Sequence, residues 1–537
     1  AFGIFRTPSL QGRDRARAVE DRPIIERQIC FMSEELLINV APGETRVAVV
    51  ESGRAVEVVL ERTMEPARQA TGRAGHSLLG NIYLGRVTRV LPGMQAAFVD
   101  VGLERAGFLG AREARCLCEL TGLDEGKLPP ISACVREGQR ILVQAVKDPI
   151  GDKGARLSAN VTLAGRLLVL VPNQAGVALS RRIEDEAERE RLLRHVEDMV
   201  ERFQALGVTG EPAGYIVRTA AIGATADEIA ADARMLADMW QGVRTQERAE
   251  QAPAIIFRDL DPVSRTLRDY VGAETTRVLI DNADAFAEAR RYAEAAMPQM
   301  LPRLQLFNGP GELFDIYDVE GQIETALDSR VALPSGGWIT VESTEALTAI
   351  DVNSGSYTAA TGLEETSVRI NLEAVQEIIA QLRLRGTGGL IVIDFIHMNE
   401  PENIEQVVNA LNEAFEKDRV PTQVSAMSEF GLVEMTRKRV REPLDKLLTE
   451  PAYPAGRPRR KTCATVANEL LRRIGRTAHE VPGRPILARA APDVVRWLTQ
   501  GNPYLLERLS ERVKVEVRLE GDEGLDRETI DVGSVSG

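Results

Sequence analysis

Histidine and cysteine are scarce in this chain of 537 residues, which contains 4 His and 5 Cys. No two histidines stand at a spacing suited to one metal ion, and the motifs H-E-x-x-H, G-x-S-x-G and Walker A are absent. These absences argue against a zinc hydrolase, a histidine-based triad enzyme and a P-loop nucleotidase. Five cysteines are too few, and odd in number, for a disulfide framework, which favours reduced thiols and a cytoplasmic protein.

Long apolar runs and an excess of basic residues are also lacking. Without a run of about 18 apolar residues, we expect no transmembrane helix and no membrane partner. Lys and Arg number 66 against 80 Asp and Glu, so the net charge is 66 − 80 = −14, which excludes a histone-like basic binder. Nucleic acid stays open as a partner, because local basic faces count for more than net charge. At 44% hydrophobic and 27% charged residues, the composition is that of a globular protein with roughly three to five domains.

The first half of the chain is rich in strand-like segments. Residues 1–31 lack the features of a targeting signal, and we interpret them as an extension. Short β-branched segments predict strands over 36–62, and evenly spaced strands with glycine turns predict a small barrel from about 80 to 157. A polar insertion at 112–135 holds three of the cysteines. Residues 161–250 mix strands with helical patterns, the clearest at 225–243.

The second half contains the most regular pattern. Strands are predicted around WITVES, ALTAIDVN and GGLIVIDFI, and an amphipathic helix over 366–385 connects the last two of them. Such a β-α-β unit makes its two strands parallel. We expect further helices at about 401–416 and 431–448, and then a linker rich in Pro, Arg and Lys over 450–462. A small separate domain follows it.

Carboxylates are the strongest chemical signal. Asp351 and Asn353 are two residues apart, so they share one face of an extended chain, and Asp394 ends the next apolar strand. In a parallel unit both strand ends lie at one sheet edge, where Asp351 and Asp394 can converge. Two carboxylates without histidine suit Mg²⁺, which keeps waters that can attack a phosphodiester. The alternative is that each aspartate only caps a helix or starts a turn.

Basic and aromatic residues give two weaker signals. Phe430 to Arg476 contains 12 Lys/Arg and 5 Asp/Glu, a local charge of 12 − 5 = +7, and Arg383 and Arg385 close the helix between the aspartate strands. This suits a nucleic-acid backbone, although a solvated helix face gives the same pattern. Three aromatic residues lie on the barrel beside arginines, where they could stack bases or simply fill the core: Tyr83, Phe98 and Phe108.

The motifs that identify the chain lie mainly between residues 81 and 439. They are NIYLGRVTRVLPGMQAAFVDVGLERAGFL, VKDPIGDKGARLS, SGGWITVESTEALTAIDVNSG, QLRLRGTGGLIVIDFI and GLVEMTRKR. On these segments the chain resembles the ribonuclease E/G family of bacterial endoribonucleases. Without a long C-terminal tail, it resembles ribonuclease G more than full-length ribonuclease E.

The resemblance implies a multidomain α/β and α+β fold in which the domains follow one another along the chain. The plan is a split RNase H-like domain at 32–76 plus 264–326, an OB-fold RNA-binding barrel at 77–160, a 5′-sensor at 161–263, a DNase I-like catalytic domain at 327–449, the linker at 450–462, and a small C-terminal domain at 463–537.

The resemblance also implies roles for single residues. Asp351 and Asp394 match the magnesium ligands, and Asn353 the residue that supports them. Phe98, Phe108 and Lys153 match residues that hold RNA on the barrel. Arg383 and Arg385 are further RNA-binding candidates, taken from the charge pattern and not from the resemblance. The pocket for a 5′-monophosphate is matched by Gly165, Val169, Arg218 and Thr219.

One departure concerns zinc. The family usually carries a C-x-x-C pair after the basic segment, where two subunits share a zinc ion, but Ala452 and Ala455 stand there. We therefore expect no zinc ligands, and a dimer only without a zinc link. Cys116, Cys118 and Cys134 offer three thiols with no fourth ligand, so a metal site there is the less favoured interpretation.

The expected function is a Mg²⁺-dependent endoribonuclease. It would hydrolyse single-stranded RNA to 5′-phosphate and 3′-hydroxyl ends, respond to a 5′-monophosphate, and act in rRNA maturation and mRNA decay. The alternative is a non-catalytic RNA-binding protein of the same fold. The sequence does not reveal the natural RNA targets, the preferred cleavage site or the oligomeric state.

Overall fold

The structure is a computed structural model that describes most of the chain. The described residues are 34–62, 78–118, 128–149, 154–172, 174–205, 213–272, 274–309, 311–355, 362–416, 418–452 and 459–534. The extension at 1–31, Lys153 and Ala455 therefore lie outside them. Within them, no helix combines the length and apolar character needed to cross a membrane.

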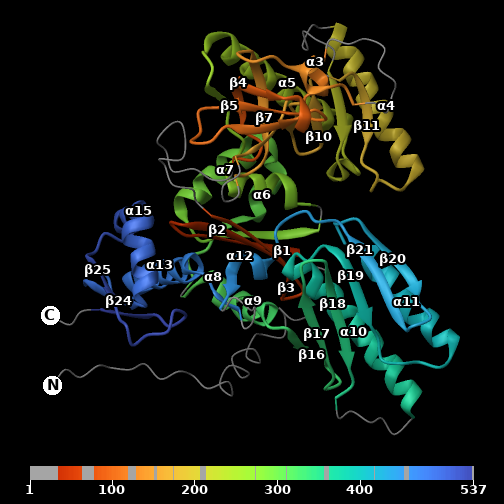
Figure 1. Cartoon of the computed structure of the whole chain (residues 1–537), viewed down its shortest axis with the longest axis vertical. Coiled ribbons are helices and arrows are strands. Elements are labelled where there is room, and N and C mark those ends of the chain that lie inside the picture. The colour runs from red at the N-terminus through yellow and green to blue at the C-terminus, as the bar shows by residue number, and fades with distance from the viewer. Residues whose placement is uncertain are drawn as a thin grey trace.

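The sheet at the centre of the molecule combines two distant parts of the chain (Figure 1). β1 (Glu34–Val40), β2 (Glu44–Glu51) and β3 (Arg54–Arg62) run antiparallel, while β14 (Thr275–Ile280) and β15 (Leu304–Leu306) extend the sheet in parallel from β1. Its two faces are buried under separate sets of helices. These are α6 (Pro262–Tyr270) and α7 (Ala283–Ala296) on one face, and α8 (Leu313–Ile316) and α9 (Val319–Leu327) on the other.

The predicted barrel is confirmed as a closed five-stranded sheet. Its strands are β4 (Ile82–Leu91), β5 (Ala96–Asp100), β6 (Gly107–Gly110), β8 (Arg156–Ser158) and β7 (Arg140–Lys147), and β7 closes the barrel by pairing with β4. β13 (Ala254–Phe257) adds to the outside of β4. Tyr83 is only 1% exposed and belongs to the barrel core, so of its two open interpretations the core-filling one is confirmed.

A four-stranded sheet packs beside the barrel. Its order is β11 (Gly176–Leu179), β12 (Gly214–Val217), β10 (Leu168–Val171) and β9 (Leu163–Ala164). Two long helices, α4 (Glu186–Ala205) and α5 (Ala226–Ala249), cover it, and the second confirms the helix predicted over 225–243. Thr225 and Glu228 form a capping box that starts α5.

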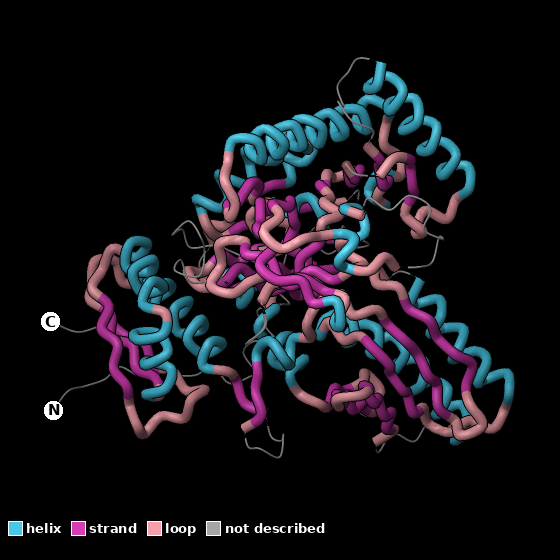
Figure 2. The backbone as a smooth tube through the Cα atoms, turned by 45° about the horizontal axis from the view of Figure 1, so that its top comes forward, coloured by secondary structure: helices cyan, strands magenta, loops and turns pink. Residues whose placement is uncertain are grey.

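The third large sheet carries the predicted β-α-β unit. Its order is β16 (Arg330–Ala332), β17 (Trp338–Ser343), β18 (Leu347–Asn353), β19 (Gly389–Asp394), β21 (Leu432–Arg437) and β20 (Thr422–Met427). α10 (Leu363–Arg385) connects β18 to β19, and both it and α11 (Pro401–Glu416) pack on a single face of this sheet (Figure 2). The helix predicted over 431–448 was wrong. LVEMTR instead alternates buried and exposed residues as strand β21, and only α12 (Leu444–Leu448) is helical.

The C-terminal part forms its own small domain. α13 (Cys463–Glu480), α14 (Pro492–Arg496) and α15 (Pro503–Val513) pack on the sheet β25 (Val517–Gly521), β24 (Ile486–Ala490) and β26 (Asp531–Ser534). Both ends of the segment expected to be a linker belong to a two-stranded sheet. β22 (Thr449–Pro451) pairs with β23 (Arg459–Lys461), and Arg459 donates to the hydroxyl of Thr449.

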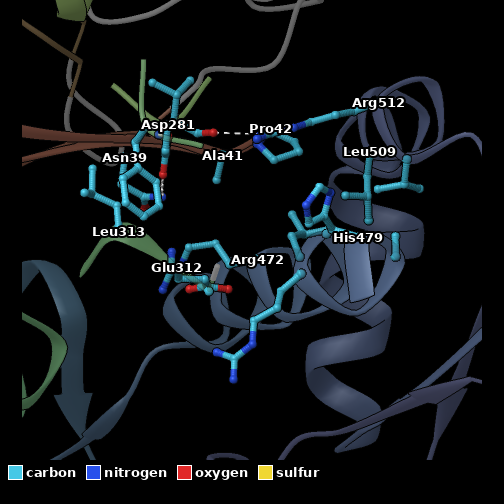
Figure 3. Close-up of a pocket in the computed structure, with 18 of the residues that line it drawn as sticks. Asn39, Ala41, Pro42, Asp281, Glu312, Leu313, Arg472, His479, Leu509 and Arg512 are labelled. Carbon is cyan, nitrogen blue, oxygen red and sulfur yellow. Dashed lines mark hydrogen bonds between the residues drawn. The ribbon is translucent and has the colours of Figure 1, made fainter. Parts of the chain in front are cut away.

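This C-terminal domain docks on the central sheet around a cavity of about 430 Å³ (Figure 3). Asn39 and Asp281 contribute from the sheet, and Arg472, His479 and Arg512 from α13 and α15. Arg512 donates to the carbonyl of Val40 at 2.8 Å, and Arg472 pairs with the buried Glu44. Polar contacts therefore dominate this interface, next to a separate apolar core inside the domain.

Candidate functional site

Asp351 and Asp394 are direct neighbours on the two parallel strands of the β-α-β unit. The register pairs Asp351 with Asp394, which places their Cα atoms about 4.8 Å apart, the spacing of adjacent strands. Beneath them, Ile350, Val352 and Ile393 are buried against α10 and α11. Because side chains alternate along a strand, this burial turns both aspartates to the opposite, open face. The convergence expected from the sequence is confirmed.

The carboxylates are exposed on this open face. Asn353 donates from Nδ2 to Oδ2 of Asp351 at 2.8 Å, so the amide fixes that carboxylate and keeps its own oxygen as an acceptor. The carboxylate of Asp394 has no hydrogen bond or ion pair among the residues that the structure describes. The donor set is thus two carboxylates and an amide oxygen, all hard oxygen ligands.

These oxygens fit Mg²⁺. This ion binds through one or two carboxylates and keeps several of its waters, so it needs no larger protein cage. Among the described residues, no group of three or more His, Cys, Asp or Glu could hold a metal ion. The pair fits an open magnesium site on a solvent-facing sheet.

The loop after β19 is tied to the start of α10. Glu364 accepts hydrogen bonds from the side chains of Asn403 and Asn399 and from the backbone of Glu400. These bonds lower the pKa of Glu364 to about 2. Because the Glu364 carboxylate stays ionised, it keeps its hydrogen bonds to the segment that follows Asp394 in the chain. At the other end of α10, Gly386 adopts φ 68° and caps the helix before β19 begins.

An aromatic residue on the same open face escaped the sequence analysis. Trp338 of β17 is paired with Asn353 in the register, and the guanidinium of Arg330 lies 3.8 Å from the ring centroid. This cation–π pair stands beside the aspartates. The segment SGGWITVES contained the signal, but only the strand register shows that Trp338 is next to the site.

The barrel brings Phe98 and Phe108 together. They are paired between β5 and β6, with ring centroids 6.2 Å apart and planes at 76°, an edge-to-face contact. Both are only partly buried, and the exposed Arg89 lies opposite Phe98 on β4. The rings and the cation form an accessible surface. Lys153 lies outside the described residues.

The residues matched to the 5′-end pocket also meet. Arg218 follows β12 and donates through Nη1 to the carbonyl of Gly165 at 2.6 Å and through Nη2 to Asp269 at 2.7 Å. Thr219 shares a hydrogen bond with Ser180 at 3.1 Å. Val169 lies on β10, in the next strand of the same sheet. Asp269, which holds the guanidinium in place, could not be identified from the sequence.

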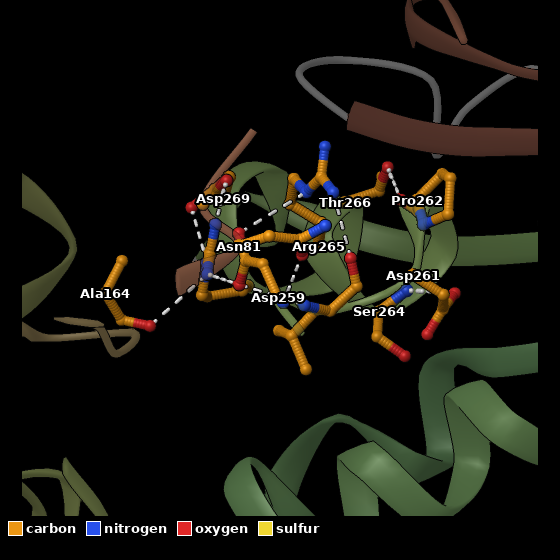
Figure 4. Close-up of polar contacts among 12 residues, drawn as sticks. Asn81, Ala164, Asp259, Asp261, Pro262, Ser264, Arg265, Thr266 and Asp269 are labelled. Carbon is orange, nitrogen blue, oxygen red and sulfur yellow. Dashed lines mark hydrogen bonds and ion pairs between the residues drawn. The ribbon is translucent and has the colours of Figure 1, made fainter. Parts of the chain in front are cut away.

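Two carboxylates organise the backbone and the cations around Arg218. Asp232 accepts from the amides of Arg166, Leu167 and Leu168, which folds the turn after Gly165. Burial by itself would raise the pKa of Asp269. The hydrogen bonds and charges of Arg268 and Arg218 outweigh this effect, so the net result is a lowered pKa. Figure 4 shows Asp269 among the polar contacts of α6, where Arg268 also reaches Asp259 and the carbonyl of Ala164. Arg218 is therefore attached through Asp269 to α6, one of the helices that cover the central sheet.

The two arginines taken from the charge pattern have structural partners. Arg385 is buried, and its guanidinium donates to Gln381 and to the carbonyl of Asp328. Arg383 forms an ion pair with Glu51 of β2 at 2.7 Å. Both therefore join α10 to neighbouring elements, and their placement favours this role over contact with RNA.

The three cysteines of the barrel insertion lie near one another. Cys134 is buried, and burial together with the neighbouring Cys118 raises its pKa to about 11. Among the described residues, these thiols do not belong to a group that could hold a metal ion.

Comparison with known proteins identifies relatives along nearly the whole chain. A sequence model of the Ribonuclease E/G family matches residues 162–440. The chain is 40% identical over 503 residues to Ribonuclease G of Haemophilus influenzae, covering 93% of this chain and 99% of that protein. It is 39% identical over 505 residues to Ribonuclease G of Escherichia coli K12, with the same coverage. To Ribonuclease E of Haemophilus influenzae it is 39% identical over 411 residues, which is 76% of this chain and 42% of that protein.

Proposed function

This chain belongs to the ribonuclease E/G family and is an endoribonuclease, and we propose that it hydrolyses single-stranded RNA with Mg²⁺ held by Asp351 and Asp394. The observation that carries the proposal is the register of the two aspartates on one exposed sheet face. The products would be 5′-phosphate and 3′-hydroxyl ends, and the processes rRNA maturation and mRNA decay.

Each residue of the site has a distinct task in this proposal. Asp351 and Asp394 provide the carboxylates that hold the ion, and Asn353 fixes the orientation of Asp351 through its amide. Bound Mg²⁺ supplies a water of lowered pKa and offsets charge on the phosphoryl oxygens. The open sheet face admits an extended RNA strand, and the edge-to-face pair Phe98 and Phe108 offers aromatic surface to its bases.

The proposal is tested by cleavage of an end-labelled single-stranded RNA with and without Mg²⁺. A hydrolase of this kind yields discrete products only when the ion is present. Ca²⁺ serves as a control for charge, because it binds oxygen ligands with looser geometry. Retention of RNA without cleavage under any metal condition would instead favour a non-catalytic RNA-binding protein of the same fold.

A preference for 5′-monophosphorylated RNA is the next expected result. Arg218 and Thr219 lie together beside Gly165, and a charged hydrogen bond to a terminal phosphate is worth about 1.5–3 kcal/mol, or roughly 10- to 150-fold in kcat/KM. We expect this advantage over 5′-hydroxyl and 5′-triphosphate ends to disappear in Arg218→Ala. Initial rates on the three substrates measure it.

Arg194→Ala is the matched control for this experiment. Arg194 is exposed on α4 of the same sheet-and-helix unit and bonds only to the carbonyl of Glu190 among the described residues. The control should keep the preference. Equal rates of the wild-type protein on all three ends would contradict the assignment of the pocket.

We also predict that the purified protein holds no stoichiometric zinc. A shared tetrahedral site needs four ligands, two from each chain, and Ala452 and Ala455 offer none. A dimer would then form through apolar surface of the catalytic or C-terminal domain. Elemental analysis together with light scattering before and after chelation checks both points. About one zinc per two chains, lost with the dimer, would show this to be wrong.

A further inference from the structure

A small pocket lies at the end of the catalytic sheet opposite to the aspartates. It has a volume of about 220 Å³ and is formed by the turn between β17 and β18, the loop before β19 and the segment after β21. Its polar lining consists of Ser343, Thr344, Thr348, Thr387, Arg439, Arg441, Glu442 and Lys446. Hydroxyls and cations therefore predominate, with one carboxylate.

Three glycines at the start of β19 and just before it allow the side chains of Arg439 and Arg441 to approach the backbone closely. Gly389 has φ 111°, and a Cβ there would lie 2.6 Å from Nη2 of Arg439. A Cβ on Gly386 would lie 2.6 Å from Nε of Arg441, and one on Gly388 would lie 3.1 Å from the Cα of Arg439. The sequence RGTGGL thus builds a shallow site that longer side chains would fill.

The cations differ in how far they are already neutralised. Arg441 is engaged, because it pairs with Glu57 at 2.8 Å and donates to the carbonyl of Arg383. Arg439 is exposed and uses only Nε, on the carbonyl of Gly388. Lys446 is exposed and has no ion-pair partner among the described residues. Two cations are thus available to a ligand, against the single exposed carboxylate of Glu442.

The pocket also lies in line with the catalytic face. Leu347 lines it and sits four residues before Asp351 on β18, with its side chain on the same face. At about 3.3 Å per residue, this is roughly 13 Å from the aspartates. An RNA strand that crosses the open face along β18 reaches the pocket within a few nucleotides.

We propose that this pocket binds a backbone phosphate of the RNA substrate a few nucleotides away from the cleaved bond. Arg439 and Lys446 supply the charge, and the exposed hydroxyl of Ser343, which shares a hydrogen bond with the buried Thr348 at 3.4 Å, can donate to a remaining oxygen. Such a contact carries no base information and secures the register of the strand on the sheet. The inference rests on the proposed function. It adds two RNA-binding residues, Arg439 and Lys446, that are needed neither for metal binding by the aspartates nor for recognition of the 5′ end.

The test removes the two available cations together, in Arg439→Gln/Lys446→Gln. Binding of a labelled single-stranded RNA in Mg²⁺-free buffer is measured across a range of salt concentrations. We expect Kd to rise about tenfold at low salt, and the slope of log Kd against log salt to fall by roughly 0.7 for each lost contact. Arg439→Lys/Lys446→Arg keeps both charges and should keep the slope.

Substrate length gives a second readout. For the wild-type protein, an oligonucleotide extended by several nucleotides past the cleavage site on the pocket side should have a KM about tenfold below that of the short one. In the double glutamine variant this advantage should shrink to less than about twofold. Arg484→Gln/Arg496→Gln removes two exposed cations of the C-terminal domain and is the control for lost net charge.

The outcomes separate the pocket from the proposed function. If the wild-type protein cleaves RNA and the double glutamine variant has the same Kd and the same salt slope as the wild type, only the assignment of this pocket is wrong. A wild-type protein that neither binds nor cleaves RNA would overturn the proposed function and the pocket with it. An equal loss in the control variant would show that net charge, and not this pocket, determines binding.

Discussion

Asp394→Asn is expected to lower the rate of RNA cleavage by roughly 10³-fold while the protein still binds RNA. The substitution keeps the size of the side chain and removes the carboxylate charge beside Asp351. The carboxylate of Asp394 has no hydrogen-bond or ion-pair partner among the described residues, and the substitution keeps the backbone pairing with β18 and β21, so the variant should fold as the wild-type protein does. Single-turnover cleavage and a binding titration on the same RNA measure the two effects separately.

A carboxylate on the same face serves as the control. Glu434 of β21 is exposed on the open side of the sheet, where its register partner is Val392 and not Asp394, and Glu434→Gln makes the same chemical change there. Its cleavage rate should stay within a few-fold of the wild-type rate. Normal turnover by a folded Asp394→Asn or Asp351→Ala protein would rule out the assigned site.

The second large effect is on stability. Arg437 and Asp418 form an ion pair at 2.7 Å whose side chains are only 4% and 2% exposed, and Arg437 also donates to the carbonyl of Thr387. Asp418→Ala leaves an unpaired buried guanidinium, which should cost about 3–5 kcal/mol. Hydrogen exchange of the amides of β19 and β21 reports the lost local stability, because a chain of several domains does not unfold in one step.

The control for this experiment is an exposed pair. Arg290 and Glu294 are 62% and 49% exposed on α7, so Glu294→Ala should cost less than about 1 kcal/mol. Replacing both buried partners, in Arg437→Met/Asp418→Leu, should recover much of the loss, since no charge then remains buried. Unchanged exchange in Asp418→Ala would show that water reaches the guanidinium.

The elements near the aspartates could be predicted because local pattern and packing agree there. α10 and α11 follow from helical periodicity with clear ends, and the alternation of ALTAIDVN and LIVIDFI fixes which side chains face away from the helices. A crossover helix between two strands leaves only a parallel arrangement. The meeting of Asp351, Asn353 and Asp394 therefore follows from sequence alone.

The error at 431–448 has a physical reason. The segment carries many charged residues that also suit a solvated helix, and its strand character depends on long-range partners. β21 pairs with β19 and β20, and Arg437 is buried only because Asp418 and the carbonyl of Thr387 are there to meet it. Helix propensity is weaker than such pairing. The same holds for β22 and β23, which pair across the segment interpreted as a linker.

The sequence by itself determined the carboxylate pair, the helices behind it and the barrel, because each depends on neighbours within a few dozen residues. Only the tertiary structure decided which charges are available to a ligand. Arg383 pairs with Glu51, Arg385 donates to the carbonyl of Asp328, and Arg218 is held by Asp269, all from other parts of the chain, while Arg439 and Lys446 are exposed. The charge of a side chain is known from the sequence. Whether a counterion lies beside it depends on residues far away in the chain, which only the folded structure brings together.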